Sequence, residues 1–156
     1  MRHARLAFAI LLSTLAGPAL AFDTPKALLE AIYQPYQGQA ERGDIGRFLS
    51  ARLEDIRQNQ TSTVAASADH SDDLANFDPF VQGDAFFPFD LLIAEPAVLG
   101  DRAIATVSFR NFGAPSLMSI AMVRESDGWK VDDIASMGEG ENWLYSWLLT
   151  VDPFGN

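Results

Sequence analysis

The segment from Phe77 to Phe89 concentrates the residue types from which a small-molecule site is built. It contains five of the eleven phenylalanines of the chain, with two aspartates and a glutamine among them. A mostly apolar, aromatic cavity with a few convergent polar groups is typical of ligand pockets, and burial against such walls raises the pKa of a carboxylate. The alternative is that the phenylalanines fasten helices to a sheet, while Asp78 caps a turn before Pro79. The candidate ligand-binding residues of this segment are Asp78, Phe80, Gln82, Asp84 and Phe87.

Other residue types with reactive side chains are scarce. Cysteine is absent and histidine occurs only at His3 and His70, which excludes thiol and redox catalysis, Cys-ligated zinc and a His-rich metal site within one chain. The acidic stretch 69–73 lacks the alternating ligands and distal glutamate of a calcium loop, so the pattern favours a solvated loop. No Gly-x-Ser-x-Gly motif accompanies His70. We therefore expect no metal and no cofactor.

The chain is strongly acidic, with 11 Lys and Arg against 21 Asp and Glu and a net charge of −10. If Arg2 and Arg5 leave with a signal peptide, 9 basic and 21 acidic residues remain, a charge of −12. Such a surface repels nucleic acid and anionic lipid headgroups, because both bind proteins through Lys and Arg. We expect no nucleic-acid partner.

The first 21 residues have the pattern of a cleavable signal peptide. A basic start is followed by an apolar run from Leu6 to Leu15, which is too short to cross a bilayer that needs about 20 residues. Ala19, Leu20 and Ala21 then form a small-x-small cleavage pattern. The sequence predicts a cut after Ala21, a periplasmic or secreted location with no membrane anchor after cleavage, and one domain over residues 22–156.

Periodicity predicts helices first and strands afterwards, which is an α+β fold. A four-stranded antiparallel meander follows from the short turns between the strands, with Asp127 and Gly128 as the strongest hairpin signal. The polar residues 58–68 extend the second helix or form a short third one. The expected elements are a helix from Thr24 to near Tyr36, a helix from Asp44 to Ile56, strands at 91–98 (interrupted by Pro96), 102–112, 117–124 and 129–135, and an apolar helix from Asn142 to Leu149.

Two motifs in this layout resemble a known family. The run from Asp127 to Ile134, Asp-Gly-Trp-Lys-Val-Asp-Asp-Ile, is similar to that of the cone-shaped α+β superfamily named after nuclear transport factor 2. Within it, an Asp-Pro-Phe motif with a nearby Gln and Asp resembles exported bacterial proteins of the domain of unknown function 3828. The matching residues here are Asp78, Pro79, Phe80, Gln82 and Asp84, with Gly83 as a departure.

This resemblance implies N-terminal helices packed on a curved sheet around a conical pocket. Enzymes of this superfamily, such as ketosteroid isomerase, pair a pocket carboxylate as base with a tyrosine that donates to an oxyanion. Here Asp78 or Asp84 would be the base and Tyr33 or Tyr36 the donor. The resemblance therefore adds Tyr33, Tyr36 and Trp129 to the candidate ligand-binding residues.

Three functional hypotheses follow. The first is an exported, non-catalytic binding module for a small apolar ligand or a protein partner, favoured because no nucleophile or metal site is evident. The second is a small isomerase, dehydratase or hydrolase. The third is an inhibitor or immunity protein whose acidic face blocks a basic exported effector. A partner-binding role, or a homodimer, predicts an exposed apolar patch around Trp143, Tyr145 and Trp147.

Overall fold

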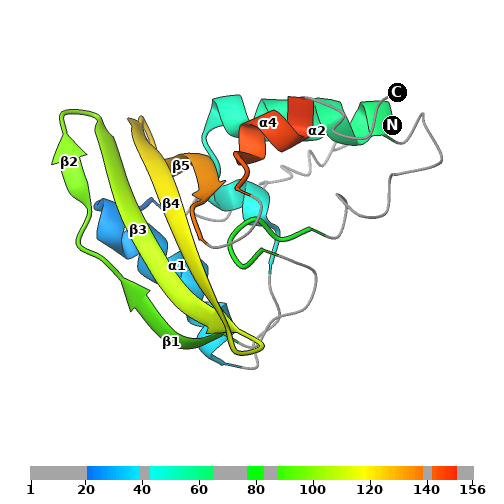
Figure 1. Ribbon diagram of the computed structural model, residues 1–156. Helices are drawn as coiled ribbons and strands as arrows, with labels where there is room; N and C mark the ends of the chain where they lie inside the picture. The colour runs from blue at the N-terminus through cyan, green and yellow to red at the C-terminus, as the bar shows by residue number, and fades with distance from the viewer. Residues whose placement is uncertain (1–20, 39–42, 65–76, 83–87, 139–141, 151–156) are drawn as a thin grey trace, which may run out of the picture.

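The computed structural model describes residues 21–38, 43–64, 77–82, 88–138 and 142–150 (Figure 1). The predicted signal peptide, apart from Ala21, lies outside the described residues. The same holds for the acidic stretch 69–73 and for two candidate site residues, Asp84 and Phe87. Within the described part of the chain, no helix is long and apolar enough to cross a membrane.

An antiparallel sheet with helices on one of its faces forms an α+β fold, which confirms the predicted class. The sheet has the order β1-β3-β4-β5, and β2 also pairs with β3. The strands are β1 (Pro88–Ile93), β2 (Ala97–Leu99), β3 (Arg102–Asn111), β4 (Ala114–Glu125) and β5 (Gly128–Ser136).

The predicted first strand, 91–98, consists of two short strands. β1 ends at Ile93, β2 begins at Ala97, and both pair with β3. Pro96 lies between them, and a proline has no N–H to donate to a ladder. The expected interruption therefore divides this strand completely, and the sheet has five strands where the sequence predicts four.

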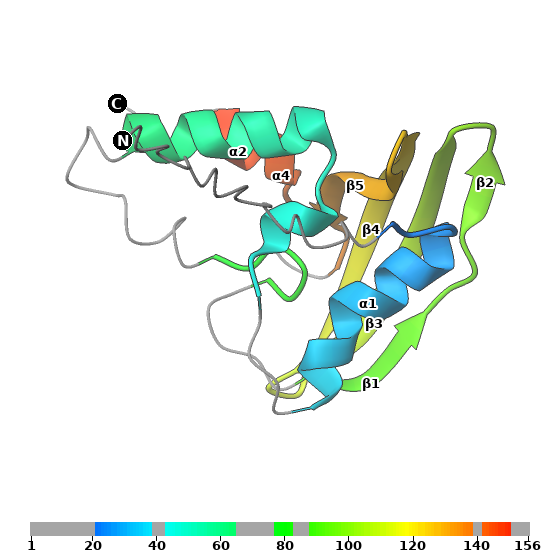
Figure 2. The same ribbon diagram turned by 180° about the vertical axis from the view of Figure 1, so that it is seen from behind.

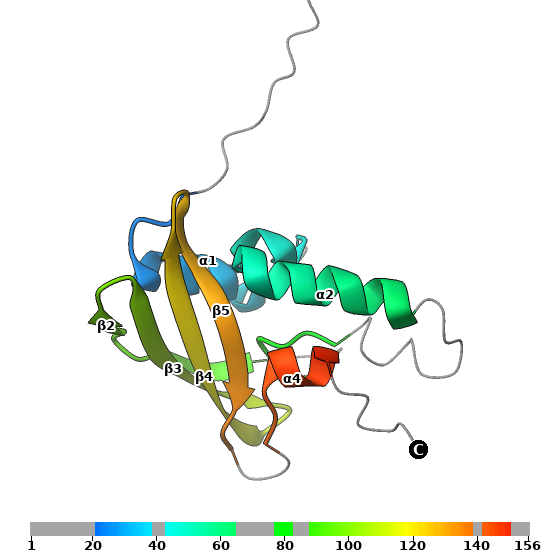
Figure 3. The same ribbon diagram turned by 90° about the horizontal axis from the view of Figure 1, so that it is seen from above.

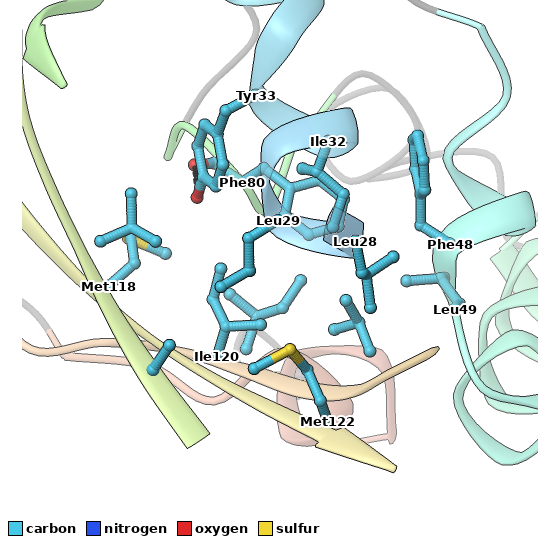
Figure 4. Packing of buried hydrophobic residues seen from close by; sticks show 14 of the residues in the cluster. Leu28, Leu29, Ile32, Tyr33, Phe48, Leu49, Phe80, Met118, Ile120 and Met122 are labelled. Atoms are coloured by element: carbon cyan, nitrogen blue, oxygen red, sulfur yellow. Dashed lines mark hydrogen bonds between the residues drawn. The ribbon is translucent and has the colours of Figure 1, made fainter. Parts of the chain in front are cut away.

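Helix α1 (Pro25–Gln37) covers one face of the sheet, in front of the strands in Figure 2. The hydroxyl of Thr24 accepts a hydrogen bond from the amide of Ala27 at 3.1 Å, so Thr24 is the helix cap that the sequence predicts. Figure 4 shows the apolar side of α1 packing towards β4. The buried side chains at this contact include Leu28, Leu29, Ile32, Met118, Ile120 and Met122.

The predicted second helix, Asp44 to Ile56, is wrong in one respect, because it is broken after its first turn. Asp44 caps a short 3-10 helix, η1 (Ile45–Phe48), and α2 (Ala51–Val64) begins only after Leu49 and Ser50. Leu49 forms a parallel bridge with Val131 of β5, and the amide of Ser50 donates to the carbonyl of Val131 at 2.8 Å. The edge of the sheet captures these backbone groups, so they do not continue a helix.

The C-terminal helix α4 (Tyr145–Thr150) begins three residues later than the predicted cap at Asn142. Its start is set by β5, because the carboxylate of Asp133 accepts hydrogen bonds from both the amide and the hydroxyl of Ser146. An aspartate at a helix N-terminus satisfies N–H groups that have no partner within the helix. Figure 3 shows α4 beside β5 and α2.

The two faces of the sheet differ in what covers them. Ala103, Ala105, Val107 and Phe109 of β3 are buried on the face towards α1, which we call the inner face. The alternate residues of β3 point to the opposite, outer face, as the sequence pattern predicts. Figures 1 and 2 show the described helices on the inner side, with the outer face uncovered by them.

Candidate functional site

Four of the predicted site residues come together between α1 and the segment 77–82. The hydroxyl of Tyr36 donates to Asp78 Oδ2 at 2.6 Å, and the hydroxyl of Tyr33 donates to the carbonyl of Phe80 at 3.0 Å. The ring of Tyr33 also meets that of Phe80 edge-on, with centroids 6.3 Å apart. These four residues, the Tyr–Asp cluster, are all buried.

The electrostatics of this cluster keep Tyr33 in the protonated, hydrogen-bond-donating form. Burial raises the pKa of Tyr33, and the negative charge of Asp78 raises it further. Burial also raises the pKa of Tyr145 to about 12; Arg57 opposes this shift, and Asp78 and Glu54 add to it. Tyr33 and Tyr145, whose pKa values the charge of Asp78 helps to raise, therefore stay protonated at physiological pH.

The hydrogen bonds of the Tyr–Asp cluster hold segment 77–82 against α1. Asp78 Oδ1 accepts from the amide of Phe80 at 2.9 Å, while Oδ2 accepts from Tyr36. Among the described residues, no buried side-chain nitrogen or oxygen lacks a hydrogen-bond partner. A base must be able to take a proton from a substrate, whereas both oxygens of this carboxylate already accept hydrogen bonds from the protein.

Two further predicted site residues lie elsewhere. The side-chain amide of Gln82 donates to the hydroxyl of Ser136 at the end of β5. Trp129 is buried at the start of β5, where its amide donates to the carbonyl of Phe22 at 2.8 Å. Neither contact involves the Tyr–Asp cluster, so the structure does not bring all the described candidates into one site.

A second polar cluster, which the sequence analysis did not identify, lies where β5 bulges between Val131 and Asp133. Asp132 accepts hydrogen bonds from Ser50 at 2.9 Å and Arg52 at 3.0 Å, and Arg102 lies 3.4 Å away. Burial alone would raise the pKa of Asp132, but the bonds from Arg52 and Ser50 and the nearby positive charges outweigh it and lower the pKa. Two adjacent aspartates within a strand pattern were the available signal. Within the described part of the chain, no group of three or more His, Cys, Asp or Glu residues is placed to hold a metal ion.

The exposed patch predicted around Trp143, Tyr145 and Trp147 does not form as expected. Trp147 is 52% exposed, but Tyr145 is buried and Trp143 packs edge-on against Phe77 with ring centroids 5.2 Å apart. The short α4 turns one side towards α2 and β5, which buries Tyr145. Larger exposure of apolar side chains occurs on the outer face of the sheet.

Comparison with known proteins places the fold beside one solved complex. No protein-family profile and no curated protein sequence matches the chain. The structure is similar to a chain in the crystal structure of the type VI native effector–immunity complex Tae3–Tai3 from Ralstonia pickettii, with a TM-score of 0.50. The match covers 76% of this chain and 99% of that chain at 18% sequence identity. A likeness at this identity shows a shared α+β fold.

Proposed function

We propose that this protein is an exported immunity or inhibitor protein that binds an effector protein and blocks it. The observation that carries the proposal is the state of the predicted pocket residues. Those described in the Tyr–Asp cluster are buried, and their polar groups bond to one another or to the backbone. Because these groups already have partners inside the protein, recognition of another molecule is better assigned to the surface.

The surface properties of the chain fit a protein partner. A net charge of −10 attracts basic proteins and increases their rate of association. The structural likeness to a chain of an effector–immunity complex supports the same class of function. Export after cleavage at Ala21 remains part of the proposal, because an inhibitor must share a compartment with its target.

The experiment begins with the full chain, tagged at its C-terminus and produced in its own cell. A periplasmic protein that co-purifies is identified by mass spectrometry and then produced alone in the periplasm of a test bacterium. We expect it to stop growth, and we expect growth to return when the present chain is co-produced. A partner that is harmless, or a toxic partner whose effect the chain does not relieve, contradicts the proposal.

A small-molecule site at the Tyr–Asp cluster is the second candidate. The 2.6 Å contact between Tyr36 and Asp78 favours it, because a tyrosine beside a buried carboxylate is the pairing expected for binding or catalysis in the cone-shaped fold. Native mass spectrometry separates the two functions. A small molecule retained by the wild-type chain and lost by Tyr36→Phe would support this candidate.

A further inference from the structure

The peptide bond at the predicted cut joins an exposed residue to a buried one. Ala21 is exposed, whereas Phe22 is only 7% exposed and belongs to the hydrophobic core. The ring of Phe22 meets that of Phe48 with centroids 5.8 Å apart. Its carbonyl accepts a hydrogen bond from the amide of Trp129 at 2.8 Å, which ties the start of the domain to β5. The residue that would begin the mature chain is therefore part of the fold.

The turn between β4 and β5 has the shape that the backbone of Phe22 requires. Figure 3 shows the first described residues, in blue, beside this turn. Gly128 has a φ of +116°, and a Cβ there would lie 2.7 Å from the backbone nitrogen of Phe22 and 2.9 Å from its carbonyl oxygen. Side chains do not approach backbone atoms so closely, so only glycine leaves room for this contact. The backbone of Phe22 is therefore packed against the hairpin.

The residues that follow the cut are also held in place. Only residues 22–24 separate the bond from α1, whose cap is Thr24 and whose first residue, Pro25, is buried. A peptidase binds its substrate as an extended chain on both sides of the bond that it cuts, so a folded chain must first open locally. Opening here gives up the buried aromatic surface of Phe22 and its hydrogen bond to β5. The folded chain therefore protects this bond.

We propose that the bond between Ala21 and Phe22 is a processing site that is open only before Phe22 docks on the turn between β4 and β5. The peptidase that fits is one that accepts small side chains, such as Ala19 and Ala21, before the cut. Cleavage adds one water across the amide bond, so Ala21 leaves with a new carboxylate and Phe22 keeps a new α-amino group. The inference rests on the export step of the proposed function and adds an order of events, in which cleavage precedes folding of the N-terminal segment.

The test measures how fast purified signal peptidase cuts the full-length precursor in detergent. The folded wild type is compared with Ile120→Asp, which places a charge at a fully buried position of β4 and should unfold the chain without changing the cut. Near-ultraviolet circular dichroism reports which precursor is folded. We expect the folded precursor to be cut at least about tenfold more slowly than the unfolded one, because burial of an aromatic side chain keeps the released form rare. Equal rates for a folded and an unfolded precursor overturn the proposal.

Two glycine variants provide a second measurement, which stands even if Ile120→Asp stays folded. Gly128→Ala crowds the backbone of Phe22 and should speed cleavage at least about threefold. Gly113→Ala is the matched control, because Gly113 also has a positive φ but no atom lies within 4 Å of the added Cβ, so the rate should stay within about twofold. Equal rates for the two variants overturn the proposal, as does a product whose N-terminal sequence does not begin at Phe22. Neither result bears on effector binding, which co-purification tests separately.

Discussion

The inner and outer faces of the same sheet carry similar aliphatic side chains in different surroundings. On the inner face, Val107 and Ile120 are fully buried, and Figure 4 shows Ile120 beneath α1. On the outer face, Ile104 is half exposed, although it is only three positions from Val107 on β3. The comparison shows that residue type alone does not distinguish a buried strand position from an exposed one, because the covering helix makes the difference.

The two edges of the sheet differ in the same way. Leu49, just after η1, forms a bridge with β5, and the approach to α4 bridges β5 at Ala135. On the other side, β2 is exposed along its whole length. The closed edge is therefore part of the framework, while the open edge adjoins the exposed side chains of Leu99 and Ile104.

The largest predicted effect concerns leucines at covered and uncovered positions. Leu29→Ala removes a fully buried side chain from α1 and should cost about 2–5 kcal/mol of unfolding free energy, because it leaves a cavity. Leu99→Ala should change stability by less than about 0.5 kcal/mol. Urea denaturation with a common m-value measures both changes. Equal costs at the two positions would remove the distinction between the faces.

Two Tyr→Phe variants test the interior hydrogen bonds. Tyr36→Phe removes a donor to the buried carboxylate of Asp78 and should cost about 1–3 kcal/mol. Tyr33→Phe removes a bond to a neutral carbonyl and should cost about 1 kcal/mol, because bonds to charged groups are stronger. Chemical denaturation gives both values. A neutral Tyr36→Phe would mean that Asp78 does not depend on this donor.

Two glycines in the turns of the sheet differ in what surrounds them: Gly128 lies between β4 and β5, and Gly113 lies between β3 and β4. Gly128 has φ of +116°, and a Cβ there would lie 2.7 Å from the backbone nitrogen of Phe22. Gly113 has φ of +85° with no atom within 4 Å of such a Cβ. Gly128→Ala should cost about 1–3 kcal/mol and more than Gly113→Ala, because only the first adds a backbone clash to the conformational strain. Thermal unfolding of the two variants measures the difference, and identical costs would exclude a close approach of Phe22.

The smallest predicted effect is a pH dependence at the bulge of β5. The pKa of Asp132 is lowered in the folded protein, so its contribution is complete above the unfolded-state value of about 4 and is lost as pH falls through the lower folded-state pKa. Because Asp132 is partly exposed, the gain should stay below about 1 kcal/mol. Urea midpoints of wild type and Asp132→Asn should converge towards pH 3. A difference that grows on acidification would contradict the assignment.

Local patterns in the sequence predict much of the fold. The capping of α1 by Thr24, the alternation along β3 and the hairpin at Asp127 and Gly128 each depend on a few adjacent residues. The break at Leu49 does not, because it arises from pairing with Val131, which is distant in the sequence. Such long-range pairing leaves no periodic signal in either segment.

The candidate site is predictable to a lesser extent. Residue types point to both Tyr36 and Asp78, but the two residues are separated by 42 positions and their hydrogen bond depends on the packing of α1. The exposure of Leu92, Leu99 and Ile104 escapes the sequence analysis for a related reason. That Leu92 and Ile104 lie on the same uncovered face becomes clear only once the ladder register and the position of α1 are known. The relation of the chain to the nuclear transport factor 2 superfamily stays a prediction.

Native mass spectrometry of the protein purified from the periplasm of its own cell tests the central claim, that recognition occurs at the surface of the fold. The account predicts a complex with an exported protein, which dissociates on addition of salt, and a free chain that carries no small molecule. A chain that retains a small molecule, with no protein partner, would contradict it.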